Sequence, residues 1–280
     1  MKRLLSLLLC CSSLMAFSQD EEDLSLLARP IVAEGKRLYR SEMASWYGTD
    51  LFLEKYSDRS NIGGYFSYSE GAVSTCIFFN RAEAPRVIGT ISFDSSYNLK
   101  TATVNLEERG FNAYEADLYQ IRRAAQQAIP GDTLFHHYEN ANLNLIPLID
   151  GERRVVYLLT GPKKSGYVIF GNDYLLQFDS NNRLTSKKGL HRNIITSPYA
   201  KQGAQVAGMH SHRPETGDFI TATDICTLML YARFAGWEQY NVVSEKYVNI
   251  WNCRSNELVV ITMEAMKRIY DHQEAGKGGQ

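Results

Sequence analysis

The chain is organised around residues 208–224, Gly208-Met209-His210-Ser211-His212-Arg213-Pro214-Glu215-Thr216-Gly217-Asp218-Phe219-Ile220-Thr221-Ala222-Thr223-Asp224. A short apolar run leads into the two histidines, which is typical of a buried strand. Side chains two residues apart on a strand point to the same side, so His210 and His212 can offer two imidazole nitrogens to one metal ion. The pattern therefore predicts a strand that ends in a metal-binding pair.

A helix is predicted to follow the pair, after a break at Pro214. Thr221 is a natural N-cap for this helix, and Asp224 stands three residues later, where a carboxylate favours the positive end of a helix. Two histidines and one carboxylate are also the ligand set of a hydrolytic zinc site with one open position. Two interpretations stay open: a metal site of His210, His212 and Asp224, or a hydrogen-bonded core pair of histidines with a capping acid.

At these residues the chain resembles the JAMM (MPN-type) zinc metalloprotease family, whose signature is His-x-His-Pro, then Ser or Thr-x-x-Asp, with a catalytic Glu on an earlier strand. The resemblance implies zinc ligation by His210, His212 and Asp224. It also implies that the Thr221 hydroxyl helps to stabilise the tetrahedral intermediate. Two features depart from the family: Arg213 stands in place of the proline, and the interval between the second histidine and the aspartate is one residue longer.

The family's general base is a Glu that follows a helix and begins a strand beside the histidine strand. Glu139 matches this description, because it comes after a predicted helix and directly before the β-like run 140–145. Glu152 is the rival, since its separation from His210 is closer to the family's. It adjoins Asp150-Gly151, a strong hairpin-turn pair, so its expected place is an exposed turn. The resemblance thus implies Glu139 as catalytic base, with an ordinary surface acid as the alternative reading of this residue.

The whole chain predicts an α+β fold built from antiparallel β-meanders with helices. Helical periodicity and an Asn112 cap predict helices, and turn residues separate the β-rich runs. The expected helices are 21–47, 113–129 and 263–274; the expected strands are 65–68, 73–79, 87–93, 99–106, 143–149, 154–160, 166–170, 174–178, 184–190, 242–253 and 258–262. We expect an N-terminal helix and meander region at 19–111, an MPN-like metal-site domain at 112–275 and a disordered tail at 276–280.

The two meanders share a short motif. Phe93-Asp94-Ser95 in the first corresponds to Phe178-Asp179-Ser180 in the second, and each follows a β run and, earlier, a helix. Such a match can mark an internal repeat. It can equally reflect two ordinary hairpins, because Asp and Ser stabilise turns locally.

Residues 1–18 have the parts of a secretory signal peptide: a charged start, a short apolar core and an Ala-x-Ser exit. We therefore expect a secreted or periplasmic protein. The formal net charge of -1 gives no electrostatic footprint for nucleic acid, and no later stretch is apolar enough to span a membrane. Cys76, Cys226 and Cys253 are widely spaced, which favours buried thiols, although a bridge between the last two stays open.

These patterns predict an exported zinc-dependent hydrolase that cleaves peptide or isopeptide-like amide bonds in a peptide or protein substrate. The alternative is a non-catalytic binding or structural module of the cell envelope that keeps an MPN-like fold. A third interpretation makes the paired histidines core residues of an envelope protein without enzymatic function. The donor set also suits iron or manganese, and no pattern in the chain indicates an oligomeric state.

Overall fold

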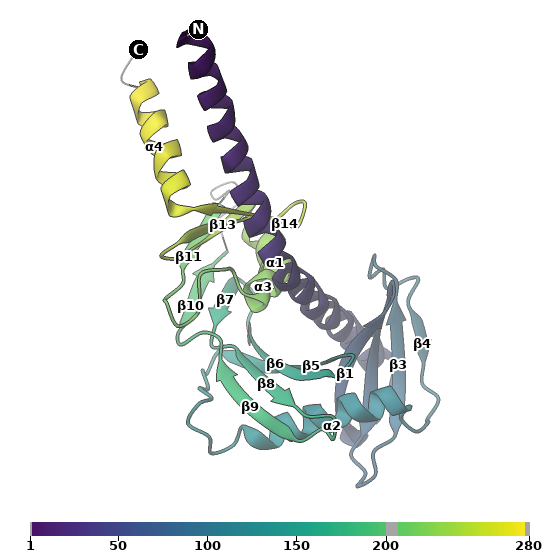
Figure 1. Ribbon diagram of the computed structural model, residues 1–280. Helices are drawn as coiled ribbons and strands as arrows, with labels where there is room; N and C mark the ends of the chain where they lie inside the picture. The colour runs from purple at the N-terminus through teal and green to yellow at the C-terminus, as the bar shows by residue number, and fades with distance from the viewer. Residues whose placement is uncertain (1, 200–206, 278–280) are drawn as a thin grey trace. The chain divides into compact units, whose positions relative to one another are not determined.

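The computed structural model describes residues 2–199 and 207–277, and within these ranges it is an α+β protein, as predicted, with four α-helices and four sheets (Figure 1). The chain divides into two compact units: unit 1 is Met1–Glu34 with Ala200–Gln280, and unit 2 is Gly35–Tyr199. The expected domain boundary between residues 111 and 112 falls inside unit 2. An MPN-like domain stays a prediction of the resemblance.

Unit 2 contains the same succession of elements twice, a helix followed by a four-stranded antiparallel sheet (Figure 1). The first sheet has the order β1-β2-β3-β4 and the second has the order β5-β6-β8-β9. The first copy consists of the end of α1 (Lys2–Lys55), β1 (Ile62–Glu70), β2 (Val73–Asn80), β3 (Val87–Phe93) and β4 (Thr103–Asn105). The second consists of α2 (Ala113–Ala128), β5 (Ala141–Asp150), β6 (Arg153–Pro162), β8 (Tyr174–Phe178) and β9 (Leu184–Gly189).

The core of unit 2 joins the two copies. Leu118, Ile121 and Ala125 form one stripe of α2 and are fully buried. They belong to the same apolar cluster as Phe66 of β1 and Val156 of β6. The Asn112 cap of α2 is confirmed, with a complete capping box. Because α2 shares this core with strands from both sheets, residues on either side of position 111 fold together.

The two Phe-Asp-Ser motifs occupy equivalent places, each at the end of the third strand of its sheet. In each turn the Asp side chain accepts a 2.9 Å hydrogen bond from the backbone N–H two residues later. The fourth residue after each Phe has positive φ, 51° at Tyr97 and 61° at Asn182. The same turn at the same topological position favours an internal repeat over two unrelated hairpins.

β7 (Tyr167–Gly171) departs from the predicted meander. It pairs with β10 (Ile194–Pro198), a strand that the sequence analysis does not predict, and forms a two-stranded ribbon. The cause is local: Gly171 and Asn172 both have positive φ, so the chain turns away after β7. Asp173 Oδ1 then accepts a 2.8 Å hydrogen bond from the backbone N–H of Thr160, which brings β8 beside β6.

Unit 1 contains a four-stranded sheet with the order β11-β12-β13-β14. Its elements are β11 (Ala207–Ser211), α3 (Ala222–Ala235), β12 (Gln239–Val243), β13 (Tyr247–Asn252), β14 (Glu257–Thr262) and α4 (Met263–Lys277). β11 and β12 are parallel, with α3 as their crossover, and the other pairs are antiparallel. The single strand predicted at 242–253 is wrong, because the chain turns at Ser244, whose Oγ accepts hydrogen bonds from the backbone N–H groups of Lys246 and Tyr247.

Both ends of the chain are helical where they are described. α1 is longer than the predicted helix 21–47 and continues through Pro30. Leu24 and Ala28 of α1 share an apolar cluster with Val260 of β14. Of the predicted disordered tail, residues 276 and 277 belong to α4, and 278–280 lie outside the described residues.

Two expectations about the whole chain can be compared with the structure. Among the described residues, no helix combines the length and the apolar character needed to cross a membrane. Cys226 and Cys253 are free thiols, as is Cys76, so the open question of a bridge is resolved in favour of thiols.

Glu42 of α1 is a half-buried titratable group of unit 2. Its Oε2 accepts a 2.8 Å hydrogen bond from Asn144 Nδ2 on β5. Burial raises the pKa of the carboxyl from 4.5 to about 7, and the bond from Asn144 offsets only part of that effect. The folded chain therefore holds this proton at pH values where the unfolded chain has lost it, so stability falls as the pH rises from about 4.5 to 7.

We predict that Glu42→Gln, which keeps an oxygen acceptor and removes the charge, raises the melting temperature at pH 8 by ~2–4 °C, the shift that about 1 kcal/mol gives in a chain of this size. At pH 4, below the pKa of the carboxyl in the unfolded chain, the variant and the wild type should melt together. Glu54→Gln, on an exposed position of the same helix, is the matched control. Equal shifts for Glu42→Gln at both pH values would contradict the assigned burial of charge.

Candidate metal centre

His210 and His212 point to the same side of the chain at the end of β11, as the strand pattern predicts. Each histidine is 7% exposed. Met209, the residue before His210 on the strand, points to the opposite side and is 68% exposed. The parallel pairing places His210 opposite Val242 of β12. The backbone N–H of His212 continues the pairing with a 2.8 Å hydrogen bond to Val243 O. β12 therefore holds both residues in the register that turns their imidazoles inward.

Asp224 reaches the imidazoles because it is the third residue of α3. Thr221 is the N-cap: its Oγ1 accepts a 3.1 Å hydrogen bond from the Asp224 backbone N–H and donates at 2.7 Å to Asp224 Oδ2. Oδ2 also accepts a 3.0 Å bond from the Thr221 backbone N–H. The predicted N-cap is confirmed as a capping box. The cap fixes the orientation of the carboxylate, and in this geometry the Thr221 hydroxyl proton is used to position Asp224.

Both imidazoles turn Nε2 toward the Asp224 carboxylate. His212 Nε2 lies 3.1 Å from Oδ2, and His210 Nε2 lies 3.6 Å from Oδ1. On the opposite side of each ring, His212 Nδ1 is 3.1 Å from Phe219 O and His210 Nδ1 is 3.3 Å from Tyr240 Oη. The three side chains that the sequence predicts as ligands thus lie close together, and each imidazole ring is oriented by a contact at its Nδ1 atom.

The hydrogen bond to Phe219 fixes the tautomer of His212. A carbonyl oxygen can only accept, so His212 donates from Nδ1 and, when neutral, presents the Nε2 lone pair to Asp224 Oδ2. Two acceptors at this separation repel each other unless a cation lies between them. That cation is either a proton, which makes an imidazolium–carboxylate pair, or a metal ion. A ligating histidine commonly binds a backbone carbonyl through its other nitrogen, as His212 does.

The separation of His212 from Asp224 is close to that of two ligands of one metal ion. Two ligand atoms bound to a tetrahedral zinc at ~2.0–2.2 Å are ~3.3–3.6 Å apart, and His212 Nε2 lies 3.1 Å from Asp224 Oδ2. His210 Nε2 lies 3.6 Å from the other carboxylate oxygen, Oδ1. The two imidazoles thus approach different oxygens of one carboxylate.

Asn249 of β13 holds the loop between the histidines and α3, and the sequence analysis does not single it out. Its Nδ2 donates to Asp218 O at 3.0 Å and to Val242 O at 3.1 Å, and its Oδ1 accepts from the Ile220 backbone N–H at 3.1 Å. The side chain is fully buried. These bonds fix the segment that carries the Phe219 carbonyl, so Asn249 positions the second imidazole indirectly. An Asn in a strand carries no motif that would mark this role.

Tyr240 of β12 is the other contact residue that the sequence analysis misses. It is buried beside His210, and the two rings have centroids 5.6 Å apart. Burial, and then the negative charge of Asp224, raise the pKa of its phenol, so Tyr240 is a neutral hydroxyl at physiological pH. A single aromatic residue in a β-rich segment predicts sheet packing, and only the parallel pairing of β11 with β12 places it at the site.

The remaining acidic candidates lie elsewhere. Asp218, the next candidate if Asp224 failed, pairs with Lys246 Nζ at 2.9 Å, and this hydrogen bond lowers the pKa of its carboxyl. Glu139 lies in unit 2, exposed, between α2 and β5. Glu152 is exposed in the turn between β5 and β6, as predicted.

His191 differs from its expected place in a solvated turn. Its side chain is 9% exposed, and its Nδ1 lies 3.5 Å from Asp173 Oδ2 in unit 2. The charged residues that surround it in the sequence predict solvent exposure. Its burial beside Asp173 depends on the turn between β7 and β8, which local composition does not reveal.

The comparisons with known proteins give no match: no family model, no curated protein and no solved structure is similar to this chain. The geometry of the site is therefore the basis for its assignment.

We predict that Asn249→Ala lowers the free energy of unfolding by at least ~2 kcal/mol, because it removes the partner of three backbone groups, two of them in buried hydrogen bonds. Urea denaturation monitored by tryptophan fluorescence gives the measurement. Asn241→Ala is the matched control. Within the described part of the chain, the Asn241 side chain bonds only to exposed Gln239, so its loss should cost less than ~0.5 kcal/mol. If both variants lost the same free energy of unfolding, Asn249 would have no special role in positioning the loop.

Proposed function

We propose that the chain is an exported zinc-dependent hydrolase of peptide or isopeptide-like amide bonds, similar to the JAMM-type metalloproteases. The observation that supports this proposal is the convergence of His210 and His212 Nε2 on the Asp224 carboxylate, at 3.6 and 3.1 Å. Export to the periplasm or the exterior rests on the signal-like sequence of residues 1–18.

Each residue has a separate task in this proposal. His210, His212 and Asp224 hold the metal and leave one tetrahedral position open. When bound, zinc supplies a Lewis acid that polarises the scissile carbonyl and lowers the pKa of a water molecule to ~7. Thr221 positions Asp224 through the cap, and a role for its hydroxyl toward the tetrahedral intermediate requires that it turn away from Oδ2.

Glu139 is the proposed general base, which takes a proton from the attacking water and returns it to the leaving amine. Its support is its place in the chain, after α2 and two residues before β5 begins at Ala141. This is the succession of helix, Glu and strand that the family resemblance implies.

The second candidate function is a binding module that holds a metal ion without turnover. The observation that favours it is the commitment of the Thr221 hydroxyl to Asp224, which removes one donor from a substrate oxyanion. Metal content does not distinguish the two candidates, whereas turnover does.

We predict that the purified full chain binds one equivalent of zinc and that His212→Ala does not, because the variant retains only two of three protein ligands. A chelator should lower the melting temperature of the wild type and leave that of His212→Ala unchanged, since a ligand stabilises only the state that binds it. Metal analysis and thermal melts give the measurement.

His272→Ala is the control for that experiment, because His272 is an exposed histidine on α4 of the same unit. It should bind zinc as the wild type does. The proposal would be contradicted if the wild type contained no metal, did not bind added zinc and melted at the same temperature with and without chelator. The histidines would then be a hydrogen-bonded core pair.

We predict that Glu139→Gln keeps the zinc and reduces turnover of an amide substrate by a factor of ~10² to 10⁴, the contribution of a general base. Glu152→Gln, the matched change at an exposed turn, should retain wild-type turnover. If the wild type and Glu139→Gln had equal turnover rates, another residue would be the general base. If all of these proteins bound zinc and none cleaved the substrate, the binding module would be favoured.

A further inference from the structure

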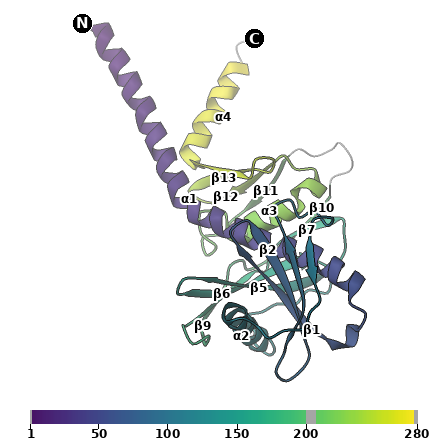
Figure 2. The ribbon, with the colours of Figure 1, turned by 90° about the vertical axis from the view of Figure 1, so that its right-hand side faces the viewer.

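Gly208 of β11 lies directly opposite Tyr240 of β12, and the two strands lie side by side in unit 1 (Figure 2). A Cβ atom at residue 208 would lie 2.5 Å from Tyr240 Cε2 and 2.6 Å from Tyr240 Cδ2. Real Cβ atoms essentially never come within 3.0 Å of another heavy atom. The glycine therefore leaves the phenol ring the space that it occupies across β11.

The packing of this ring brings its hydroxyl to His210. Trp237 packs against the ring, with centroids 4.7 Å apart, and both side chains are buried. Residues two apart on a strand share a side, so a ring that lies across Gly208 leads toward His210. Tyr240 Oη lies 3.3 Å from His210 Nδ1. The missing side chain at residue 208 and the indole of Trp237 thus determine where the hydroxyl lies.

The two histidines have different kinds of partner at Nδ1. His212 Nδ1 faces Phe219 O, which can only accept a hydrogen bond. His210 Nδ1 faces a phenol hydroxyl, which can donate or accept. His212 must therefore carry a proton on Nδ1 to make its bond. His210 can carry its proton on either ring nitrogen and keep the bond to Tyr240.

Asp224 determines which nitrogen of His210 is protonated in the metal-free chain. Asp224 Oδ1 lies 3.6 Å from His210 Nε2, which is longer than a hydrogen bond but close enough for the negative charge to act. A carboxylate favours an N–H over a lone pair on the nitrogen that faces it. Nε2 then carries the proton, Nδ1 is an acceptor, and the Tyr240 hydroxyl donates to it.

Metal ligation requires the opposite tautomer of His210. A nitrogen that binds a metal ion uses its lone pair, so ligation through Nε2 leaves the single ring proton on Nδ1. The Tyr240 hydroxyl must then turn and accept from Nδ1–H. A ligating histidine commonly has such a partner at its other nitrogen.

We propose that Tyr240 is a positioning residue that sets the tautomer of His210. Its hydroxyl donates to Nδ1 in the metal-free chain and accepts from Nδ1–H when the site holds a metal ion. His212 carries a proton on Nδ1 in both states, whereas His210 does so only with the metal. The reversal rests on the proposed metal-dependent function, and the assignment of the metal-free tautomer does not.

Long-range ¹H–¹⁵N NMR of the full chain in EDTA at pH 8, with its 6 histidines labelled, tests the metal-free tautomer. The His210 signals are those that disappear in His210→Gln. We expect a protonated Nε2 and an unprotonated Nδ1 for His210, and a protonated Nδ1 for His212. Tyr240→Phe should shift the His210 Nδ1 signal, because that atom loses its hydrogen bond.

Tyr247→Phe is the matched control for the spectrum. It removes a half-buried hydroxyl on β13 that makes no hydrogen bond within the described residues, so the His210 Nδ1 signal should stay in place. A protonated Nδ1 of His210 in the metal-free wild type would overturn the proposal. An unchanged signal in Tyr240→Phe would overturn it as well.

Zinc affinity, measured by competition with a fluorescent chelator, tests the reversal. Tyr240→Phe should bind zinc ~10- to 100-fold more weakly than the wild type, the usual effect of removing a group that holds a ligating histidine. Gly208→Ala keeps the hydroxyl and displaces the ring, so it should also weaken binding. The double variant should bind about as Tyr240→Phe does, because both changes act through one bond. Tyr247→Phe should bind as the wild type does.

The two measurements distinguish this proposal from the proposed function. If the wild type bound zinc and Tyr240→Phe bound it equally well, the metal site would stand and the reversal would be wrong. If the wild type bound no zinc, the proposed function and the reversal would both fail. The metal-free spectrum would still confirm or overturn the tautomer assigned to His210.

Discussion

The hydrogen bonds between Asp224 and the first turn of α3 set the geometry of the candidate metal centre. A helix leaves its first N–H groups without partners, and here one carboxylate oxygen, Oδ2, satisfies the cap by accepting from the backbone and hydroxyl of Thr221. The other oxygen, Oδ1, is directed at His210. The two interpretations of the sequence, capping acid and metal ligand, are therefore compatible, because a carboxylate has two oxygens and the cap orients both.

The two imidazoles are likewise oriented by hydrogen bonds to neighbouring groups. Phe219 O fixes the tautomer of His212, and the segment that carries this carbonyl is itself fixed by buried Asn249. The parallel pairing of β11 with β12 brings Tyr240 behind His210. A core pair of histidines would need such support as much as a metal site does. The distinctive feature is the direction of the two Nε2 atoms toward one carboxylate. For His212, whose Nδ1 donates to Phe219 O, this arrangement requires a proton or a metal ion between Nε2 and Oδ2.

What the sequence could predict depended on distance along the chain. The alternation at His210 and His212, the caps at Asn112 and Thr221 and most strands follow from neighbours within about four residues, and the structure bears them out. The turn at Ser244 escaped prediction because a serine hydroxyl replaces the Gly, Pro or Asn that usually marks a turn. β10 escaped it because its nearest partner residue on β7 is 23 residues away, and Asn249 because the loop that it fixes through Ile220 is 29 residues away. An MPN-like architecture stays an expectation of the resemblance.

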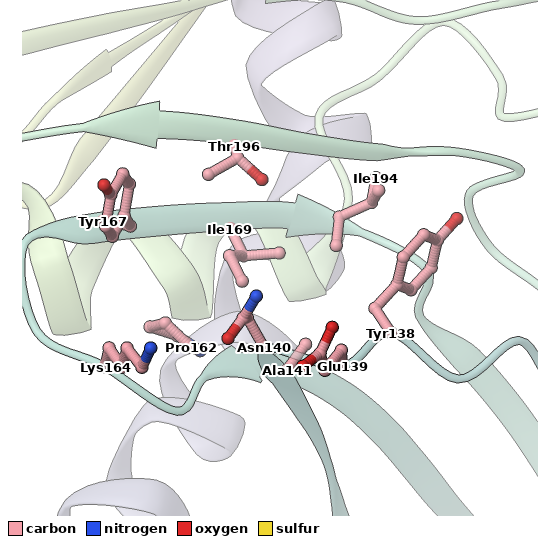
Figure 3. A pocket seen from close by; sticks show the side chains of 10 residues that line it. All are labelled: Tyr138, Glu139, Asn140, Ala141, Pro162, Lys164, Tyr167, Ile169, Ile194 and Thr196. Carbon is pink, nitrogen blue, oxygen red and sulfur yellow. The ribbon is translucent and has the colours of Figure 1, made fainter.

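The two copies of the repeat in unit 2 differ in the connection between their second and third strands. In the first copy, residues 81–86 connect β2 to β3 as a short loop without a strand. In the second copy, the equivalent connection from β6 to β8 contains β7, which leaves the sheet and pairs with β10. The added ribbon lines a hollow of unit 2 with Tyr167 and Ile169 (Figure 3). It also contributes to the interior, because Val168, Ile169 and Phe170 of β7 are buried. The second copy therefore differs from the first by a segment that both packs into the folded unit and shapes its surface.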